Sequence, residues 1–597
     1  MARVRVDSPA RRSLGARLRR WFGITVESTP NAYRIACDVL RTQRTIVAAV
    51  VAAWLAVYGG FYLGALARFP LWGPFSTIDE QLQYYQVARN YNVSGFLSSA
   101  MLPDLSTASS PAGHPYLYNH QPPGPQLFIA VLMRSFGENF RIIRLVFAAI
   151  FLLGLLSFAR FARLLESHHA YVALGIVLLI RPGTVMHIVD HPGKSVFPFA
   201  AFFPLIALYR YRESGRRAWL VAAALVVFVM SNYLMYSHLF MILAFWTLGT
   251  VLKFLRIEAR QLAMFFVLVA TGVGLHLLQT VLVMGWSVFV YEFSATLSNR
   301  MFGVPTRDEL ADFFRRHSLV LYGGHTFEFG RFRSVIWREL FFPARSIWTA
   351  ALAAVLVVAA ALELRITGQA IIISKPFARW LKTLAIALVW TGGSVTVPIV
   401  MFPAFASDYS LGGTSEFFLA IFVFLSLSVT FAYIRKLPSP EAVRMALTII
   451  MVGFLVGACV VQARDLVGSA KTIRGWVTRG SPHAGLVWVG ETLRGRVTMT
   501  NVDPTVVGFF THEIAYGGCH DGAVAGDAID SSACRVNFVR QYPQRAQPAP
   551  SAYVWVGEMQ PFCLQGLDCI DRATLDRRYT KMFDRGLVAA YDLTKPL

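Results

Sequence analysis

The residues best suited to chemistry follow the first long apolar segment of the chain. Asp79 and Glu80 form an acidic pair ahead of a helical pattern over 81–91. Adjacent carboxylates near a membrane surface could act as a general base or hold a divalent cation such as Mg²⁺ or Mn²⁺; the plainer alternative is a solvated pair at a helix N-terminus. The same segment contains four candidates for substrate binding that could converge with the pair: Tyr84, Tyr85, Arg89 and His120.

A second polar cluster is the run 187–194, with the sequence HIVDHPGK. A short turn between two apolar segments does not need an aspartate flanked by two histidines and a lysine. We therefore interpret Asp190, His191 and Lys194 as a site for an anion or a metal ion. Lys194 would meet a phosphate oxygen as a point charge, with a solvated loop lysine as the alternative. If a cation binds, Asp79 and Asp190 are its candidate ligands.

The composition shows what must position these groups. Apolar residues make up 55% of the 597 residues and charged residues only 15%, and the apolar residues come in blocks of about twenty. The sequence therefore predicts a polytopic all-α membrane protein with about eleven transmembrane helices. The predicted spans are 46–67, 139–162, 170–188, 196–212, 217–233, 235–253, 262–285, 346–364, 380–401, 416–433 and 443–461. The apolar stretch 125–136 is too short to cross and fits a helix in the interface.

Arginine and lysine follow the spans in a pattern that predicts orientation. The basic N-terminal tail, 1–45, and the basic short loops fall on one side under a single count, which the positive-inside rule makes cytoplasmic. The membrane domain, 46–461, then has its catalytic loop 68–138 and a further loop 286–345 on the outer side. The same rule accounts for much of the net charge of +22, so a nucleic-acid partner is not indicated.

Some basic residues are left unexplained by orientation. Arg181 lies well inside an apolar segment, where a charge is costly unless it faces a cavity or a partner, so it is a candidate phosphate contact or a helix-packing residue. The outer loop 286–345 contains eight arginines. They could form a basic surface for anionic headgroups or for a phosphorylated donor, or could pair with the acidic residues of the same loop.

The tail, 462–597, differs in composition and predicts a small extracytoplasmic α/β domain. Strand patterns occur at 486–490, 497–501, 506–511, 553–557 and 587–593, and 571–585 reads as a helix. The tail also contains four of the six cysteines: Cys519, Cys534, Cys563 and Cys569. Their spacing matches no standard zinc pattern, and paired cysteines persist in oxidising compartments. We therefore predict disulfides among them, with three connectivities open.

Four features occur in a fixed order: the Asp79-Glu80 pair after the first span, His120-Gln121-Pro122-Pro123 before a short helix, Arg141 and Arg144 at the next span, and the Asp190 turn. This layout resembles the GT-C superfamily of integral-membrane glycosyltransferases, within the branch of bacterial aminoarabinose transferases and protein O-mannosyltransferases. The resemblance covers about the first 215 residues, and the remainder only in general plan. Around Asp190 the chain departs from the Leu-Asp-Pro run common in relatives, which leaves the role of this carboxylate open.

The resemblance implies an enzyme that moves a sugar from a polyprenyl-phosphate carrier to an acceptor hydroxyl on the outer face of the plasma (inner) membrane. Asp79 or Glu80 would deprotonate the acceptor in one inverting displacement, and basic residues or a divalent cation would stabilise the leaving phosphate. The acceptor, whether glycan, lipid or protein, is left open. The chain itself has no Gly-rich phosphate loop, which agrees with a donor that is not a nucleotide.

Two alternatives belong to other classes. A transporter or lipid flippase would place ionisable residues at mid-membrane and show related halves, but the predicted spans are nearly free of Asp, Glu and Lys. The second alternative is a non-catalytic subunit of cell-envelope polysaccharide assembly. Neutralising the outer carboxylates discriminates between these classes, because only a transferase would lose turnover while keeping its ligand.

Overall fold

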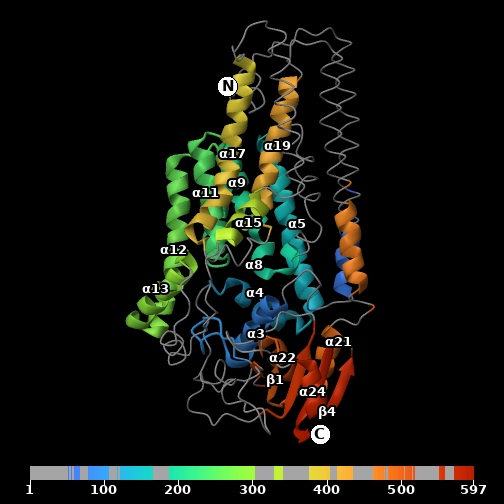
Figure 1. The fold of residues 1–597 in the computed structure, drawn as a ribbon. Coiled ribbons are helices and arrows are strands. Elements are labelled where there is room, and N and C mark those ends of the chain that lie inside the picture. The colour runs from blue at the N-terminus through green and yellow to red at the C-terminus, as the bar shows by residue number, and fades with distance from the viewer. Residues whose placement is uncertain are drawn as a thin grey trace, which may run out of the picture.

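Long helices run side by side along most of the molecule, and a small sheet lies at one end (Figure 1). The structure is a computed structural model. It describes residues 78–106, 121–165, 187–302, 329–340, 375–403, 413–434, 463–475, 482–502, 504–513, 550–557, 571–585 and 587–597, with short pieces within 52–71, at 117, 460 and 478, and over 515–517. The described part is mostly helical.

Five helices in these residues are long and apolar enough to cross a membrane: α5 (Phe140–Leu165), the stretch Pro192–Ser214 made of α8 (Pro192–Ser195) and α9 (Phe197–Ser214), α12 (Ala259–Met284), Phe377–Met401 within α17 (Lys375–Met401), and α19 (Ser415–Ile434). Two shorter apolar helices, α10 (Arg217–Ser231) and α11 (Tyr236–Val251), match the predicted spans 217–233 and 235–253. The chain is a multi-pass membrane protein. The count of eleven stays a prediction, because 346–364 lies outside the described residues, as do most of 170–188 and 443–461, and 46–67 is described only in part.

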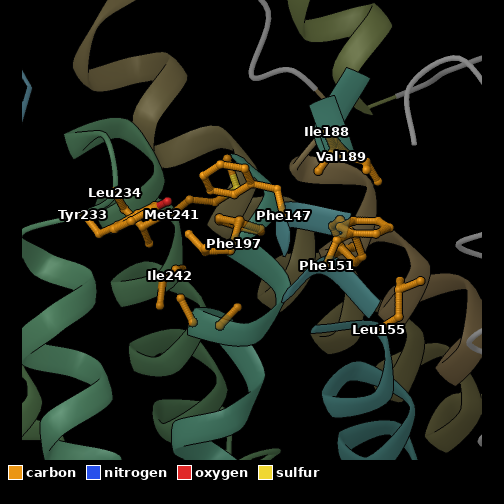
Figure 2. Close-up of a cluster of buried hydrophobic side chains, with 14 of the residues drawn as sticks. Phe147, Phe151, Leu155, Ile188, Val189, Phe197, Tyr233, Leu234, Met241 and Ile242 are labelled. Atoms are coloured by element: carbon orange, nitrogen blue, oxygen red, sulfur yellow. The ribbon is translucent and has the colours of Figure 1, made fainter. Parts of the chain in front are cut away.

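Aromatic side chains hold the membrane helices together. The ring of Phe245 on α11 stacks on Phe418 of α19, with centroids 4.2 Å apart, and on Trp390 of α17 at 4.7 Å. A second cluster lies where α5, α9 and α11 meet, and it includes Phe147, Phe197 and other buried side chains (Figure 2). Ile188 and Val189, which directly precede Asp190, belong to this cluster. The turn that contains Asp190 is therefore fixed by close-packed apolar side chains on the residues that precede it.

Two short helices form a layer beside the ends of the membrane helices. They are α3 (Ile78–Ser94) and α4 (Gly124–Phe136), which pack against each other. The predicted short helix over 125–136 is confirmed, since α4 has 13 residues and would span only about 20 Å. The start of α4 lies directly against the backbone of Asn232 and Tyr233. Glycine is needed at position 124 because a Cβ there would clash with that backbone. The loop after α12 contains α13 (Trp286–Phe302) and α15 (Phe329–Leu340).

The described end of the chain from residue 482 onward, here called the C-terminal unit, contains a five-stranded sheet in the order β2-β1-β3-β5-β4. The strands are β1 (Thr498–Thr500), β2 (Ala515–Gly517), β3 (Ala552–Val556), β4 (Tyr579–Arg585) and β5 (Val588–Pro596). β1 is parallel to β2 and β3, whereas β5 is antiparallel to β3 and β4. One face packs with α21 (Pro482–Thr492) and α22 (Pro504–Thr511) in the apolar cluster that continues into the membrane part, and the other packs with α24 (Arg572–Arg578).

Three secondary-structure predictions in this unit are wrong. The runs 486–490 and 506–511 lie in the helices α21 and α22, and residues 579–585 of the predicted helix 571–585 form the strand β4. The run 506–511 is almost wholly buried and so has no periodicity to separate helix from strand. Residues 579–585 join the sheet by pairing with β5, which no local pattern shows. The strands predicted at 497–501, 553–557 and 587–593 are confirmed as β1, β3 and β5.

Candidate active site

A buried ion pair fixes the turn that contains Asp190. Nη2 of Arg144 lies 2.6 Å from Oδ1 of Asp190, and both side chains are 2% exposed. Arg144 comes from near the start of α5, so the pair joins segments that are 46 residues apart. Removing two charges from water is costly, and their attraction offsets this cost only while the pair is intact. The carboxylate of Asp190 is therefore neutralised by Arg144.

Gln81 fastens the start of α3 to the same turn. Its Nε2 donates to the backbone carbonyl oxygen of Asp190 at 2.8 Å, and its side chain is buried. Asp79 and Glu80 precede it in the first turn of α3; the structure describes their backbone as helical and leaves their side chains undescribed. The acidic pair thus belongs to the end of α3 that contacts the Asp190 turn.

Lys194 is a buried amine whose hydrogen-bond partner is an imidazole. Its Nζ lies 3.1 Å from Nε2 of His187, and the residue is 7% exposed. Within the part of the chain that the structure describes, no carboxylate pairs with this ammonium. An ammonium has only donors, so Nε2 of His187 is the acceptor and its ring proton is assigned to Nδ1. The positive charge of Lys194 is left without a negative partner among these residues.

His191 shapes the backbone that presents Lys194. Its Nδ1 accepts a hydrogen bond from the backbone N–H of Gly193 at 3.1 Å and so caps α8. Pro192 occupies the first helical position, where a missing N–H is harmless. The ring of His191 also meets Tyr84 of α3 edge-on, with centroids 5.3 Å apart.

The two predicted tyrosines have different surroundings. The hydroxyl of Tyr84 donates to Oε1 of Gln121 at 3.2 Å, which joins α3 to the turn before α4. Tyr85 is 1% exposed and packs edge-on against Phe140, with centroids 5.0 Å apart. Burial raises the pKa of Tyr85 well above its ordinary value, although the charge of Arg144 opposes the shift. Tyr85 is therefore a neutral phenol at physiological pH.

Arg89 binds the C-terminal unit. Its Nε and Nη2 donate to the two oxygens of Glu138 at 2.7 and 2.8 Å, and Nη1 donates to the carbonyl oxygen of Phe509 on α22 at 2.7 Å. The guanidinium carbon also lies 3.9 Å from the centre of the Phe509 ring. Burial alone would raise the pKa of Glu138, but the hydrogen bonds and charge of Arg89, with His512 and Arg494, lower it. The substrate contact predicted for Arg89 stays a prediction.

Charges at the start of α5 act on a histidine of α21 in the C-terminal unit. Burial, followed by the charges of Arg141 and Arg144, lowers the pKa of His483 to about 4. The ring is therefore neutral above that pH. The protonation of a histidine in the C-terminal unit thus responds to the charges of Arg141 and Arg144.

Several predicted residues fall outside the described part of the chain. His120, Arg181 and the four cysteines Cys519, Cys534, Cys563 and Cys569 are among them. The described residues contain no group of three histidine, cysteine or acidic side chains placed to hold a metal ion. The cation predicted for Asp79 and Asp190 and the disulfides therefore stay predictions.

Two solved structures of ArnT from Cupriavidus metallidurans are similar to this chain. The apo structure is 15% identical, with 91% of this chain and 98% of that chain covered and a TM-score of 0.46. The structure bound to undecaprenyl phosphate is 14% identical, with 90% and 98% covered and a TM-score of 0.44. The predicted resemblance to GT-C glycosyltransferases thus has a counterpart among solved structures, at low identity and modest TM-score. No family model and no curated protein matches the sequence.

The sequence patterns did not indicate four residues that organise this region: Gln81, Gln121, Glu138 and Phe509. Each acts through a partner that is distant in the chain, such as Arg89 with Phe509, which are 420 residues apart. Gln81 and Gln121 gave local signals, because Gln81 directly follows the acidic pair and Gln121 lies in the motif His120-Gln121-Pro122-Pro123.

Proposed function

We propose that this protein is a glycosyltransferase that moves a sugar from a polyprenyl-phosphate carrier to an acceptor hydroxyl on the outer face of the membrane. The observation that carries the proposal is the buried ammonium of Lys194. It lies in the turn that Gln81 fastens to the first turn of α3, where Asp79 and Glu80 occur. A cation for the leaving group and a carboxylate for the acceptor are the two groups that such a transfer needs.

The charges of the described residues favour an anionic ligand. Arg144 and Asp190 cancel each other, whereas the amine of Lys194 lies beside the imidazole of His187 and beside no carboxylate among the described residues. A buried charge is costly unless it is paired, so this site is suited to a ligand that brings a negative charge. A phosphate attached to a lipid is such a ligand, and a membrane protein can take it directly from the bilayer.

The reaction is an inverting displacement at the anomeric carbon. Asp79 or Glu80 takes the proton of the acceptor hydroxyl as its oxygen bonds to the anomeric carbon. The bond from that carbon to the phosphate oxygen breaks, and the carrier leaves with the electron pair. Lys194 then stabilises the negative charge that grows on this phosphate oxygen, an interaction that is stronger in the transition state than in the bound donor.

One oxygen of Asp190 is paired with Arg144, so a divalent cation shared by Asp79 and Asp190 would have only the other oxygen of Asp190. The described residues do not complete a ligand set. We therefore assign the phosphate contact to Lys194 and route no step through a metal.

The test is a transfer assay in membranes with a panel of polyprenyl-phosphate sugars. We expect Lys194→Gln to lower turnover by about 100-fold, as for loss of one transition-state contact, and Asp79→Asn or Glu80→Gln to abolish it. Lys382→Gln is the matched control, because Lys382 is an exposed lysine of α17. Unchanged turnover in Lys194→Gln would remove Lys194 from this role. No transfer by the intact wild type from any donor would favour the flippase, which a lipid-translocation assay then measures.

A further inference from the structure

Arg89 joins α3, the helix that begins with the acidic pair, to the C-terminal unit. Its residue exposure is only 9%. The guanidinium donates two hydrogen bonds to Glu138, between α4 and α5, and one to the carbonyl oxygen of Phe509 on α22. The guanidinium also lies over the ring of Phe509. Bidentate contacts of this kind fix direction as well as distance, which a lysine cannot do.

The carbonyl that Arg89 binds lies in the last turn of α22. The last four carbonyls of a helix lack partners within that helix. Those of Gly508 and Thr511 accept from His512 and Gly495, whereas that of Phe509 accepts from Arg89. A cation at this end also meets the negative end of the helix dipole. Arg89 therefore satisfies a carbonyl at the C-terminal end of α22, and this hydrogen bond in turn fixes the position of the Arg89 guanidinium.

The contact continues toward the acidic pair along α3. Phe509 meets Phe140, with centroids 5.9 Å apart, and Phe140 meets Tyr85 of α3 at 5.0 Å. Asp79 lies ten residues before Arg89, which is about 15 Å along the helix axis. Gln81 fixes the near end of α3 to the Asp190 turn, and Arg89 fixes the far end to the C-terminal unit. Rotation or sliding of α3 is thus restrained at both ends.

We infer that Arg89 is a positioning residue, and that the C-terminal unit supports transfer by holding α3, with its acidic pair, in register through Arg89, Glu138 and Phe509. This inference rests on the proposed function, because it assigns the acidic pair its catalytic role. It gives Arg89 a task different from contact with substrate: donor binding does not depend on it, but turnover does. A misplacement of about 1 Å is enough to slow a reaction by about 100-fold.

The experiment compares Arg89→Ala, Arg89→Lys and Glu138→Gln in the full chain reconstituted in nanodiscs. We expect kcat to fall by about 10- to 100-fold in Arg89→Ala, with KM for the donor within about twofold. Arg89→Lys keeps the positive charge but loses the bidentate hydrogen bonds of the guanidinium, so its kcat should lie between those of wild type and Arg89→Ala. Arg134→Gln is the control, since Arg134 is an exposed arginine of α4 that also lies over a phenylalanine, Phe96, 4.8 Å from its centre.

A second readout separates this inference from the proposed function. Hydrogen exchange of the backbone amides of α3 and α22 should be faster in Arg89→Ala than in wild type or Arg134→Gln, whether or not a sugar is transferred. If the wild type transfers no sugar but hydrogen exchange of α3 and α22 is faster in Arg89→Ala, the proposed function is wrong, whereas the structural role of the Arg89 contact is supported. Faster exchange with unchanged kcat would overturn the positioning role. A raised KM with unchanged kcat would instead make Arg89 a substrate contact and overturn it as well.

Discussion

Lys194 and Lys581 both form hydrogen bonds, but their partners differ in charge. Lys581, on β4 of the C-terminal unit, has a side chain 35% exposed and lies 2.7 Å from Asp576 and 2.9 Å from Asp584. Lys194 is buried beside the imidazole of His187. A solvated lysine between two carboxylates needs no further ligand, whereas a buried amine beside an imidazole, with no carboxylate partner among the described residues, is suited to an anionic ligand. The proposed function therefore assigns the donor phosphate to Lys194, whereas Lys581 is paired within the C-terminal unit.

In the Arg144–Asp190 pair, each buried charge is neutralised by the other. Of all the variants, one that breaks this pair should show the largest fall in the free energy of unfolding. We expect Arg144→Met to lower the free energy of unfolding by about 3–5 kcal/mol, because Asp190 is left buried without a counter-ion. Thermal unfolding in detergent micelles measures this loss. The double variant Arg144→Met with Asp190→Leu should recover most of it. Equal losses in the single and double variants would contradict the ion-pair explanation.

His483 of the C-terminal unit is a half-buried base whose pKa responds to burial and to the charges of Arg141 and Arg144. Its pKa is lowered to about 4 from an ordinary value of about 6.5, so the unfolded chain binds the proton more readily. Stability should therefore be complete above pH 6.5 and fall as the pH drops toward 4, by roughly 2 kcal/mol at pH 5. Unfolding of the C-terminal unit, followed by hydrogen exchange at pH 7 and pH 5, measures this. His483→Gln should lose most of that pH dependence, and an unchanged slope would assign it to other groups.

Much of the candidate site could be predicted from the sequence, but its contacts could not. The helix after Asp79 and Glu80 and the polar turn at Asp190 are local patterns, and both follow from residue order. The partner of Asp190 is Arg144, 46 residues away, and no local pattern distinguishes it from the neighbouring Arg141. In the same way, the apolar run 506–511 becomes the helix α22 because α3 and the sheet pack around it. Local residue patterns could thus be predicted from the sequence, whereas long-range partners and the secondary structure of buried runs depend on packing and could not.

A smaller effect with the opposite sign would sharpen the contrast between the two lysines. Replacing Lys194 by Met removes a buried charge that the described residues do not pair, so we expect the free energy of unfolding of the empty protein to rise by about 1–2 kcal/mol. Added polyprenyl phosphate should raise the unfolding temperature of the wild type but not of the variant, because a ligand stabilises only the state that binds it. A less stable Lys194→Met protein would mean that the ammonium is already paired when no ligand is bound.

Lys581→Gln should have the smallest effect of the series. Lys581 donates to Asp576 and Asp584, and these hydrogen bonds raise its pKa, but its ammonium is solvated. Exposed ion pairs contribute less than about 1 kcal/mol, and salt screens them. We therefore expect a fall of less than about 1 kcal/mol in the free energy of unfolding, shrinking further in high salt, with transfer unchanged. Thermal unfolding at low and high salt beside the transfer assay measures both. A large loss of transfer in Lys581→Gln would break the contrast, because a lysine with two carboxylate partners would then also serve the reaction.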